Sequence, residues 1–437
     1  MLTLRVRRIL YMSFSAVFVL IAATLLLYGS GFRFDWSRKA FYQPSFIVFS
    51  VVPQPDRCFI DNQPLACMGT SFRVVAAPGN HALRLERSGY FSWEGSVAAR
   101  SGIVSSLGDI RLFRQQSSQV IADQVMRVTA SPNAKYAVVL RKTQPVLQLI
   151  DLEMSVVTPL PFEGHGAVEE MAWSPSSTEI AVQSVDNGQQ TLTFLPVTGA
   201  ASVVPIVAPA LERFQWSTRR PHHLFYLQDG VLSDLDLDAS VSTVVATNVA
   251  AWTESGNALT LISPEGNVET LDAQNPFTSS RAHLGTLLHF RHPQFVTGSS
   301  SFLAIHDPES KQLALFRLSD RVPQPLLYHN ITHCSWSEDM STLLLGSEYE
   351  LFTFNVLRSE PRLLRRSGEP LGAVLWFPNY PYLLVQQNRS LIVLDALARS
   401  TPLTIGFLQG VPQELFLNRS NNTFFSLSDE KVVAQSL

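Results

Sequence analysis

The sequence predicts an all-β protein with an N-terminal transmembrane helix, a small β-sandwich and then a β-propeller, for which eight blades are favoured over seven. Three observations predict this fold class. Residues 9–28 carry no charged side chain, residues 45–115 alternate in short runs between turn residues, and residues 116–437 repeat with a mean period of about 41 residues. An uncharged run of this length indicates a membrane span, alternation indicates strands, and such a period is typical of four-stranded propeller blades.

Length and composition exclude several classes of protein. The 437 residues are 46% hydrophobic and 16% charged, which excludes a disordered chain. The formal net charge of -3 gives no electrostatic basis for binding nucleic acid. Three cysteines cannot build a disulfide-rich scaffold or a four-thiolate zinc site. We therefore expect a folded, turn-rich chain with more than one hydrophobic core.

The uncharged run 9–28 is expected to cross a lipid bilayer as a helix. Its 20 residues rise about 30 Å, which is the thickness of the hydrocarbon core. Three arginines lie within residues 1–8, and basic residues also occur in the following stretch, 29–44. A short basic leader is the usual geometry of export, so we expect residues 1–8 in the cytoplasm, residues 29–44 as a juxtamembrane linker and the bulk of the chain outside. Aromatic residues that favour head groups crowd the far end of the span: Tyr28, Phe32, Phe34, Trp36, Phe41 and Tyr42.

Two other interpretations of this run compete with a permanent anchor. A cleaved signal peptide needs a small-x-small site, which Gly29 and Gly31 could supply, but its apolar region is usually about 7 to 15 residues long. A buried core helix needs apolar neighbours on every face, whereas the residues that follow indicate strands. We therefore expect the anchor to be retained.

Residues 45–115 are predicted to form a compact sandwich of two small sheets. About 70 residues lie near the lower limit for an independent core, so the strands must pack closely. The alternating runs, separated by proline, glycine and asparagine, predict strands at 46–52, 57–61, 71–75, 81–87, 92–98 and 108–113.

Two stretches of this module carry a recognisable spacing. Residues 78–90 begin Pro-Gly-Asn-His and end Ser-Gly-Tyr, with Trp93 just downstream, and residues 53–62 contain an alternating strand that ends in Asp-Asn. This spacing resembles the PEGA domain, a small β-sandwich usually found outside the bacterial cytoplasm. Residues 54–56 (Gln-Pro-Asp) stand where that family has Glu-Gly-Ala. The resemblance covers less than a fifth of the chain and implies an extracytoplasmic location in a bacterium.

Cys58 and Cys67 are a candidate disulfide within this module. If the hairpin turn is centred on Asn62 and Gln63, Cys58 lies opposite Cys67, with Cβ atoms about 4.5 to 5.5 Å apart. Two buried thiols are the alternative, since free cysteine is usually buried. Export would supply the oxidant. The third cysteine, Cys334, is expected in a core strand.

The remainder of the chain repeats one pattern: an apolar strand ending in tryptophan or a substitute, a turn, and further strands. Intervals between equivalent positions range from 36 to 45 residues, the length of one propeller blade. Helical repeats are excluded because 3.6-residue patterning is scarce and Val, Thr, Phe and Gly are abundant. We expect the tryptophans to pack in the core or between blades rather than to stack on a ligand. The equivalent positions are Ala130, Trp173, Trp216, Trp252, Arg291, Trp336, Trp376 and Leu417.

The two ends of the repeat region are predicted to share one sheet. The last repeat offers only three strands, at 413–417, 423–427 and 431–436, and residues 119–121 can supply the fourth. Such pairing hides edge groups that would otherwise invite aggregation. Eight equivalent positions favour eight blades, but seven remain an alternative because the fifth repeat, at 289–293, matches poorly.

Short motifs in the repeats resemble those of known propellers. Ser131-Pro132-Asn133 and the later Ser-Pro-Ser at 174–176 resemble the Ser-Pro-Asp-Gly corner of bacterial periplasmic propellers. Gly-His at 164–165 and Ile-Asp at 150–151 resemble fragments of WD-type repeats. Both resemblances concern the fold and imply no activity, because propellers host many functions.

No catalytic, cofactor-binding or metal-ligating residue is assigned from the sequence. The motifs Gly-x-Ser-x-Gly, Gly-x-x-x-x-Gly-Lys-Ser/Thr and His-Glu-x-x-His do not occur. Asp234, Asp236 and Asp238 alternate without the turn glycine and closing glutamate of a calcium loop, so we expect the solvated face of a strand. His222 and His223 have no further ligands that could complete a metal site.

The expected function is a membrane-anchored, extracytoplasmic binding or scaffold protein of the bacterial cell envelope, with the propeller docking an envelope protein or glycan. Residues 9–28 would contact the bilayer, and tethering would raise the local concentration of the docking surface. The alternative is an exported hydrolase or lyase that acts on envelope glycans or peptides, and a third reading is a periplasmic chaperone or assembly factor. Acidic and histidine pairs in the channel would favour an enzyme, whereas an apolar plug would count against it.

Overall fold

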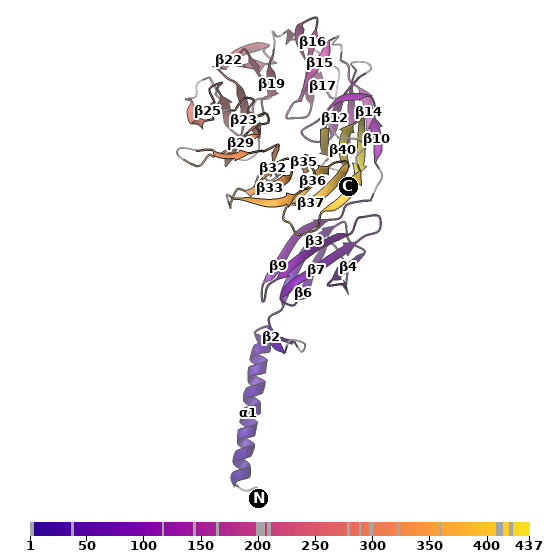
Figure 1. Cartoon of the computed structure of the whole chain (residues 1–437), viewed down its shortest axis with the longest axis vertical. Coiled ribbons are helices and arrows are strands. Elements are labelled where there is room, and N and C mark those ends of the chain that lie inside the picture. The colour runs from indigo at the N-terminus through magenta and orange to yellow at the C-terminus, as the bar shows by residue number, and fades with distance from the viewer. Residues whose placement is uncertain are drawn as a thin grey trace. The chain divides into compact units, whose positions relative to one another are not determined.

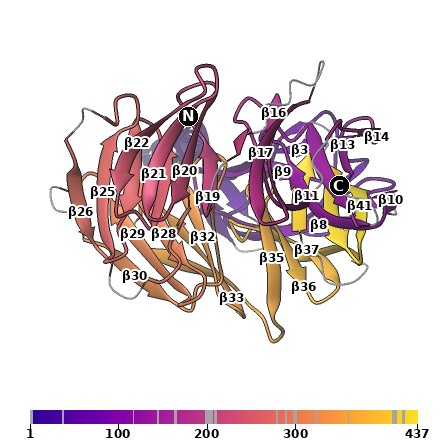
Figure 2. The same ribbon diagram turned by 90° about the horizontal axis from the view of Figure 1, so that it is seen from above.

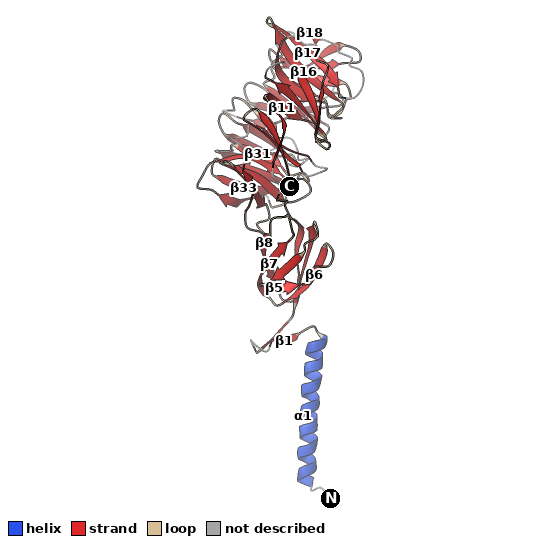
Figure 3. Cartoon of the chain, turned by 90° about the vertical axis from the view of Figure 1, so that its right-hand side faces the viewer, coloured by secondary structure: helices blue, strands red, loops and turns tan. Residues whose placement is uncertain are grey.

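The chain folds into two compact units that are mostly β-strand (Figure 1, Figure 3). Met1–Gln115 and Leu397–Pro402 form the first unit, and Gln116–Ala396 and Leu403–Leu437 form the second. The computed structural model describes residues 4–35, 39–115, 118–142, 146–162, 166–197, 206–207, 211–277, 280–287, 290–296, 301–320, 324–358, 360–407, 414–418 and 423–437.

The helix α1 (Leu4–Gly29) contains the apolar run and is the one helix among the described residues. Its end has a Schellman geometry, in which Gly31 adopts a φ of 85°, the amide of Phe32 donates to Leu27 O at 3.0 Å and the amide of Gly31 donates to Tyr28 O at 3.1 Å. Gly31 tolerates this φ because it has no Cβ atom. A short hairpin of β1 (Arg33–Asp35) and β2 (Ala40–Tyr42) follows.

Two sheets follow the hairpin in the first unit. One has the order β6-β3-β9 and the other β5-β4-β7-β8. All six predicted strands are present, although the last begins at Val104 rather than at residue 108, and β5 was not predicted. The strands are β3 (Ser45–Val52), β4 (Arg57–Ile60), β5 (Gln63–Leu65), β6 (Ser71–Ala76), β7 (Gly79–Glu86), β8 (Trp93–Ala99) and β9 (Val104–Arg111).

One pairing in this unit differs from the expected antiparallel pattern. Strands β3 and β9 are parallel, with Phe46 opposite Val104 and Val52 opposite Arg111. Alternation predicts the buried face of each strand but does not specify the direction of its neighbour. The core follows that alternation, because every second residue of β3 is buried: Ser45, Ile47, Phe49 and Val51.

The segment Leu397–Pro402 is counted with the first unit, although the sequence pattern places it within the repeats. It runs along β8, where the amide of Ser96 donates to Arg399 O at 3.0 Å and the amide of Thr401 donates to Glu94 O at 3.2 Å. Gly95 lies between these contacts, and a Cβ atom there would come within 2.5 Å of Arg399 O. The absence of a side chain at Gly95 permits this close approach.

The second unit contains eight four-stranded antiparallel sheets (Figure 2). In the first four, the strand order follows the sequence, and the first strand of one sheet contacts the first strand of the next, as β11 contacts β15; we call these first strands the innermost strands. These strands are β11 (Val125–Ala130), β12 (Tyr136–Arg141), β13 (Leu147–Asp151), β14 (Val156–Pro159), β15 (Ala167–Trp173), β16 (Glu179–Asp186), β17 (Gln189–Pro196), β18 (Ile206–Val207), β19 (Arg213–Trp216), β20 (His223–Gln228), β21 (Val231–Asp236), β22 (Val241–Thr247), β23 (Ala251–Ser255), β24 (Ala258–Ile262), β25 (Asn267–Asp272) and β26 (Ala282–Thr286).

Three of the other four sheets repeat this order, and the eighth combines the two ends of the unit. These strands are β27 (Gln294–Val296), β28 (Phe302–Asp307), β29 (Gln312–Arg317), β30 (Leu326–His329), β31 (His333–Trp336), β32 (Thr342–Gly346), β33 (Glu350–Asn355), β34 (Pro361–Arg366), β35 (Leu371–Trp376), β36 (Tyr382–Gln387), β37 (Ser390–Asp395), β38 (Leu403–Phe407), β39 (Glu414–Asn418), β40 (Thr423–Ser428), β41 (Lys431–Ser436) and β10 (Gln119–Ala122).

The predicted pairing of the two ends is confirmed. Strand β10 pairs antiparallel with β41, with Gln119 opposite Ala434 and Val120 opposite Val433. The eighth sheet therefore takes three strands from the C-terminal end and one from the beginning of the unit. This pairing removes the free edge that β41 would otherwise expose.

The core of the second unit lies between neighbouring sheets. Middle strands such as β12 and β28 are buried along most of their length, because both faces of each sheet are covered. One apolar cluster joins the first two sheets through Val138, Leu149 and Trp173, and another joins the eighth sheet to the first through Val139 and Phe425. Continuous burial of apolar side chains is what holds such an array together.

Candidate functional site

A cavity of about 430 Å³ lies against the innermost strands of the second unit. Strands β11, β15 and β39, from three consecutive sheets around the β10–β41 pairing, supply its lining. Apolar and charged side chains are mixed in this lining, which is typical of sites that recognise a ligand. The lining residues are Arg127, Val128, Thr129, Ala130, Glu170, Met171 and Phe416.

The two charged residues that line this cavity, Arg127 and Glu170, share one register position with Arg213 of the next sheet. Arg127, Glu170 and Arg213 each lie three residues before the last residue of their strand. We call them the charged row. Because β11, β15 and β19 are equivalent innermost strands, the row alternates basic, acidic and basic across three sheets. The row also follows from the repeat itself, because its members lie three residues before the equivalent positions Ala130, Trp173 and Trp216.

Burial governs the protonation of Glu170. Desolvation raises the pKa of the Glu170 carboxyl above its ordinary value, and the guanidinium groups of Arg213 and Arg127 oppose this shift. Arg127 also donates from Nη1 to the backbone carbonyl of Glu169, which fixes its side chain near the carboxyl. The row can therefore exchange hydrogen bonds with a polar ligand, and Glu170 can hold a proton more readily than a solvated carboxylate can.

The tryptophans pack between sheets, as predicted. Four of the five repeat tryptophans donate from the indole nitrogen to a backbone carbonyl of the preceding innermost strand, and three of these four rings are buried. The pairs are Trp173 to Thr129 O at 3.1 Å, Trp216 to Ala172 O at 3.0 Å, Trp336 to Val296 O at 3.1 Å and Trp376 to Ser335 O at 3.2 Å. An indole N–H that is used in this way stabilises the contact between sheets.

Trp252 does not occupy the repeat position that the sequence indicated for it. In the other repeats the closing tryptophan faces the second residue of the next strand, as Trp216 faces Leu224. In the fourth sheet that place, opposite Leu259, is taken by Glu254. Trp252 and Glu254 are two residues apart and share one face of β23, so periodicity could not separate them.

Glu254 replaces the tryptophan contact with a polar one. Its buried carboxylate accepts hydrogen bonds from Ser217 Oγ at 3.1 Å, from Thr218 Oγ1 at 3.0 Å and from the amide of Thr218. These donors belong to the turn that follows Trp216 in the neighbouring sheet. The fourth repeat therefore contacts the third through the Glu254 carboxyl group instead of through an indole ring.

Arg291 was also wrongly placed at the repeat position. It precedes β27, where its amide donates to Asp307 Oδ2 at 2.7 Å and its Nη1 atom lies 3.1 Å from Glu309 Oε1. The carbonyl that receives the indole of the next sheet belongs to Val296, five residues further along the chain. The fifth repeat therefore matches poorly because Arg291 lies in the connection before β27 and not at the end of that strand.

The prediction of a solvated face for the three alternating aspartates is wrong for Asp234. This side chain is 4% exposed and lies 2.6 Å from Arg220 Nη1 and 3.2 Å from His223 Nδ1. Strand β21 is an interior strand of a sheet that is covered on both faces, so alternation alone does not expose a residue. Asp238 is exposed as expected and lies 2.9 Å from His222 Nδ1, which raises the pKa of that imidazole.

These histidines and aspartates do not assemble a metal site. Within the part of the chain that the structure describes, no group of three or more His, Cys, Asp or Glu side chains has a geometry that could hold a metal ion. Around Asp234, Arg220 forms an ion pair from the turn before β20, and His223 lies within hydrogen-bond distance, so both contacts belong to the interior of one sheet.

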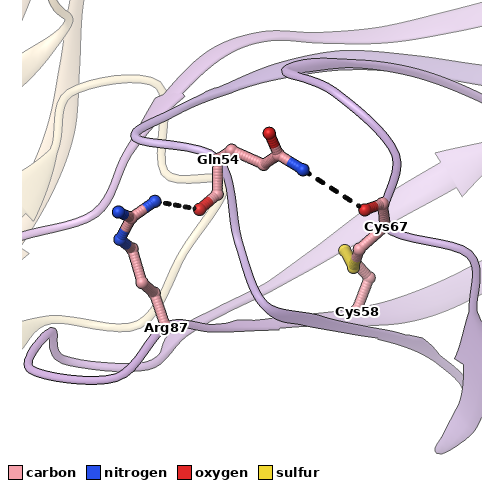
Figure 4. Close-up of a disulfide and its surroundings, with 4 residues drawn as sticks. All are labelled: Gln54, Cys58, Cys67 and Arg87. Atoms are coloured by element: carbon pink, nitrogen blue, oxygen red, sulfur yellow. Dashed lines mark hydrogen bonds between the residues drawn. A yellow bond between two sulfur atoms is a disulfide. The ribbon is translucent and has the colours of Figure 1, made fainter.

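Cys58 and Cys67 lie together in the first unit (Figure 4). Their sulfur atoms are bonded, and their Cα atoms are 5.8 Å apart. The register differs from the prediction, because Cys58 faces Leu65 and the turn is at Asp61 and Asn62, with φ values of 50° and 63°. Two residues with positive φ make the tight hairpin turn that places the register two residues earlier.

The surroundings of the cysteine pair hold its loop in place. Gln54 Nε2 donates to Cys67 O at 3.5 Å, and Arg87 Nη1 donates to Gln54 O (Figure 4). Cys334 is not bonded to another cysteine, and burial raises the pKa of its thiol to about 12. A thiol with so high a pKa is inert as a nucleophile at neutral pH.

Comparisons with known proteins bear on the fold alone. No protein-family model and no curated protein matches the chain. A chain of the crystal structure of the mitotic checkpoint complex is 12% identical, with a TM-score of 0.44, and the match covers 74% of this chain and 93% of that one. The computationally designed Ika8 protein is 11% identical, with a TM-score of 0.51, and the match covers 72% of this chain and 96% of that one. The many small antiparallel sheets and the likeness to Ika8 give the chain a β-propeller-like fold.

Proposed function

We propose that this protein is a single-pass protein of the bacterial plasma membrane, with a closed eight-bladed propeller that docks an envelope protein or glycan outside the cytoplasm. Residues 9–28 are its anchor, residues 1–8 its cytoplasmic tail and residues 45–115 a PEGA-like sandwich. The observation that carries the docking function is the charged row beside the 430 Å³ cavity on the innermost strands.

The anchor is supported by the exposure of the apolar helix. Leu10–Gly29 has a mean hydropathy of 2.3, and none of this stretch is buried by the rest of the chain. Side chains on all sides are more than half exposed, for example Phe14 at 73% and Leu26 at 72%. Apolar surface of this extent is strongly unfavourable in water and is favourable in lipid. A cleaved signal sequence has the same composition, so the mature N-terminus decides between the two.

Closure of the propeller is supported by the strand order and the apolar clusters. Eight four-stranded sheets and the pairing of β10 with β41 are what a closed ring of eight blades requires. The apolar clusters each join neighbouring sheets, including the eighth and the first. In a closed ring the innermost strands face the central channel, which would make the charged row accessible from it.

A PEGA-like identity for the sandwich is supported by its turns. The two sheets, the turn before β7 and the bend at Gly89, which has a φ of 77°, agree with the resemblance. The bonded cysteine pair is compatible with an oxidising compartment outside the cytoplasm.

The composition of the cavity favours docking over catalysis. Phe416 and Met171 offer apolar surface, whereas Arg127 and Glu170 offer one hydrogen-bond donor group and one acceptor group. Such a mixture suits a sugar ring or a protein side chain that has both apolar and polar atoms.

The alternative of an exported hydrolase or lyase is favoured by one observation, the raised pKa of Glu170. A carboxyl that keeps its proton is a candidate general acid. Glycoside hydrolysis also needs a second carboxylate about 5 to 10 Å away, and Glu170 is the one acidic residue in the described lining of the cavity.

Crosslinking and pull-down of the full chain from its native membrane test the proposal. We expect a saturable envelope protein or glycan, with capture at least tenfold weaker for Arg127→Ala and Glu170→Ala than for the wild-type chain. Arg358→Ala, which removes an exposed arginine from a turn, is the matched control and should capture normally. Cleavage of an envelope polymer that is abolished by Glu170→Gln would replace docking with the enzyme alternative.

A further inference from the structure

The first unit exposes an apolar row on the outer face of its three-stranded sheet. In register, Val75 of β6 and Val104 of β9 each face Phe46 of β3, which is half-buried, and the exposed Ile103 directly precedes Val104 at the end of the turn. Val75 is 63% exposed, Ile103 53% and Val104 55%. We call these four residues the Phe46 row. Isolated exposed apolar residues are common, but a contiguous row across three strands marks an interaction surface.

Basic side chains flank this row. The guanidinium of Arg73 lies over the ring of Phe46, 4.1 Å from its centroid, and is exposed. Arg100 is exposed in the turn before β9, where its carbonyl accepts from the amide of Ile103 at 3.1 Å. Apolar side chains with basic neighbours match the boundary between acyl chains and anionic head groups.

The chain between α1 and the Phe46 row is short. Gly29 and Arg33 are four residues apart, as are Tyr42 and Phe46, and the hairpin pairs Arg33 with Tyr42. With about 3.6 Å per extended residue and about 5.5 Å across the pair, Phe46 can lie no more than about 35 Å from the end of the helix. The polar layer of a bilayer begins where the helix leaves the hydrocarbon core, so the row is within reach of it.

Hydrogen bonds of Gln43 connect the end of the helix to the turn before β9. Gln43 Nε2 donates to Ser30 O, in the cap of the helix, at 3.4 Å, and Ser101 Oγ donates to Gln43 O at 3.3 Å. A Cβ atom at Gly102 would come within 2.6 Å of Gln43 Oε1, so the turn that carries Ile103 packs closely on Gln43. The helix end and one end of the Phe46 row are thus joined through a single residue.

We propose that the Phe46 row seats on the anionic surface of the same bilayer that α1 spans, giving the protein a second membrane contact. The proposal rests on the proposed function, because it needs α1 to be in the membrane. Its occupant is the lipid surface, since the row lies within about 35 Å of the helix end and is flanked by arginine. A second copy of the chain or a partner protein would be a different occupant, and the test distinguishes them.

The test uses the full chain in vesicles that contain about one third anionic lipid, with an environment-sensitive fluorophore on Val75→Cys. Val244→Cys, on the outer strand β22 of the second unit, is the matched control, because Val244 is 57% exposed. Val104→Cys repeats the measurement on a second strand, in case one variant folds poorly. The unsubstituted chain supplies the background labelling of its own cysteines.

We expect the labels at Val75 and Val104 to shift to shorter emission wavelength and to be quenched by head-group-level spin-labelled lipid at least threefold more than the label at Val244. Neutral vesicles should weaken this quenching. Quenching equal to that of Val244 while the chain resists carbonate extraction would overturn this inference and leave the anchor intact. A blue shift that disappears on dilution of the protein in lipid would indicate a second copy and also overturn it. Release of the chain by carbonate would remove the proposed anchor and this inference together.

Discussion

Replacement of Glu254 by alanine should destabilise the second unit. The carboxylate is 4% exposed and accepts hydrogen bonds from the side chains of Ser217 and Thr218 and from the amide of Thr218. Removing a buried acceptor costs about 1 to 3 kcal/mol for each donor that stays unsatisfied. Ser217 is 5% exposed, whereas Thr218 is exposed and can turn to water. We therefore expect Glu254→Ala to lower the free energy of unfolding by about 3 kcal/mol.

Two further variants make this prediction specific. Glu254→Gln keeps one carbonyl oxygen as an acceptor, so it should cost about 1 kcal/mol. Glu153→Ala removes an exposed carboxylate from a turn and should cost less than about 0.5 kcal/mol.

Differential scanning calorimetry of the full chain in detergent measures the effect. At about 2 °C per kcal/mol for a large unit, the main transition of Glu254→Ala should fall by about 6 °C and that of Glu254→Gln by about 2 °C. If the alanine and glutamine variants unfold within 1 °C of each other and of the wild-type chain, Glu254 does not connect the two sheets in the way that its contacts indicate.

Three further predictions concern titration and the cysteines. A non-reducing peptide map should join Cys58 to Cys67, and free thiols at both positions would contradict the bridge. The double substitution Cys58→Ser and Cys67→Ser should lower the free energy of unfolding by about 2 to 3 kcal/mol, because the unfolded chain gains the entropy of the opened loop. Because burial raises the pKa of Glu170, the folded state binds its proton more tightly, so stability should fall as pH rises from the ordinary value of 4.5 to the raised pKa and then level off. Glu170→Gln should remove the contribution of Glu170 to the slope in urea titrations between pH 4 and 7, and a slope equal to that of the wild-type chain would refute the assignment. Cys334, with a pKa of about 12, should resist iodoacetamide at pH 8 in the folded chain and react after denaturation, and rapid labelling of the folded chain would show that it is accessible.

The repeat and its closing pair were predictable from the sequence. Eight equivalent positions, five of them tryptophans, indicate the mean period, and the missing fourth strand of the last repeat indicates the partner of residues 119–121. These signals survive in the sequence because each repeat must bury the same faces against its neighbours.

The wrong predictions have a common origin, because the alternation of apolar and polar residues does not specify the neighbouring strand or sheet. It could not tell Trp252 from Glu254, since both lie on one face of β23, and it could not reveal that β3 and β9 run parallel. It also placed Asp234 in solvent, although β21 has sheets on both of its faces. Position along a strand fixes a face, but the neighbouring strand and sheet decide what covers that face.

The charged row of the candidate site was beyond single-residue motifs. Arg127, Glu170 and Arg213 are separated by 43 residues each and hold the same place in their repeats, but they differ in residue type and charge, so no motif marks them. They become neighbours through the equivalence of three innermost strands, and that equivalence follows from register rather than from composition. The cysteine pair illustrates the same limit, because the sequence indicates both cysteines and a turn near Asn62 but not the register in which Cys58 faces Leu65.

Electron cryomicroscopy of the full chain, purified from its own membrane into lipid nanodiscs, tests the central claim most directly. The account predicts α1 crossing the disc and, beyond it, a ring of eight four-stranded blades in which the strand at 119–122 pairs with the strand at 431–436. A seven-bladed or open array, or a mature chain that begins after residue 31, would contradict it.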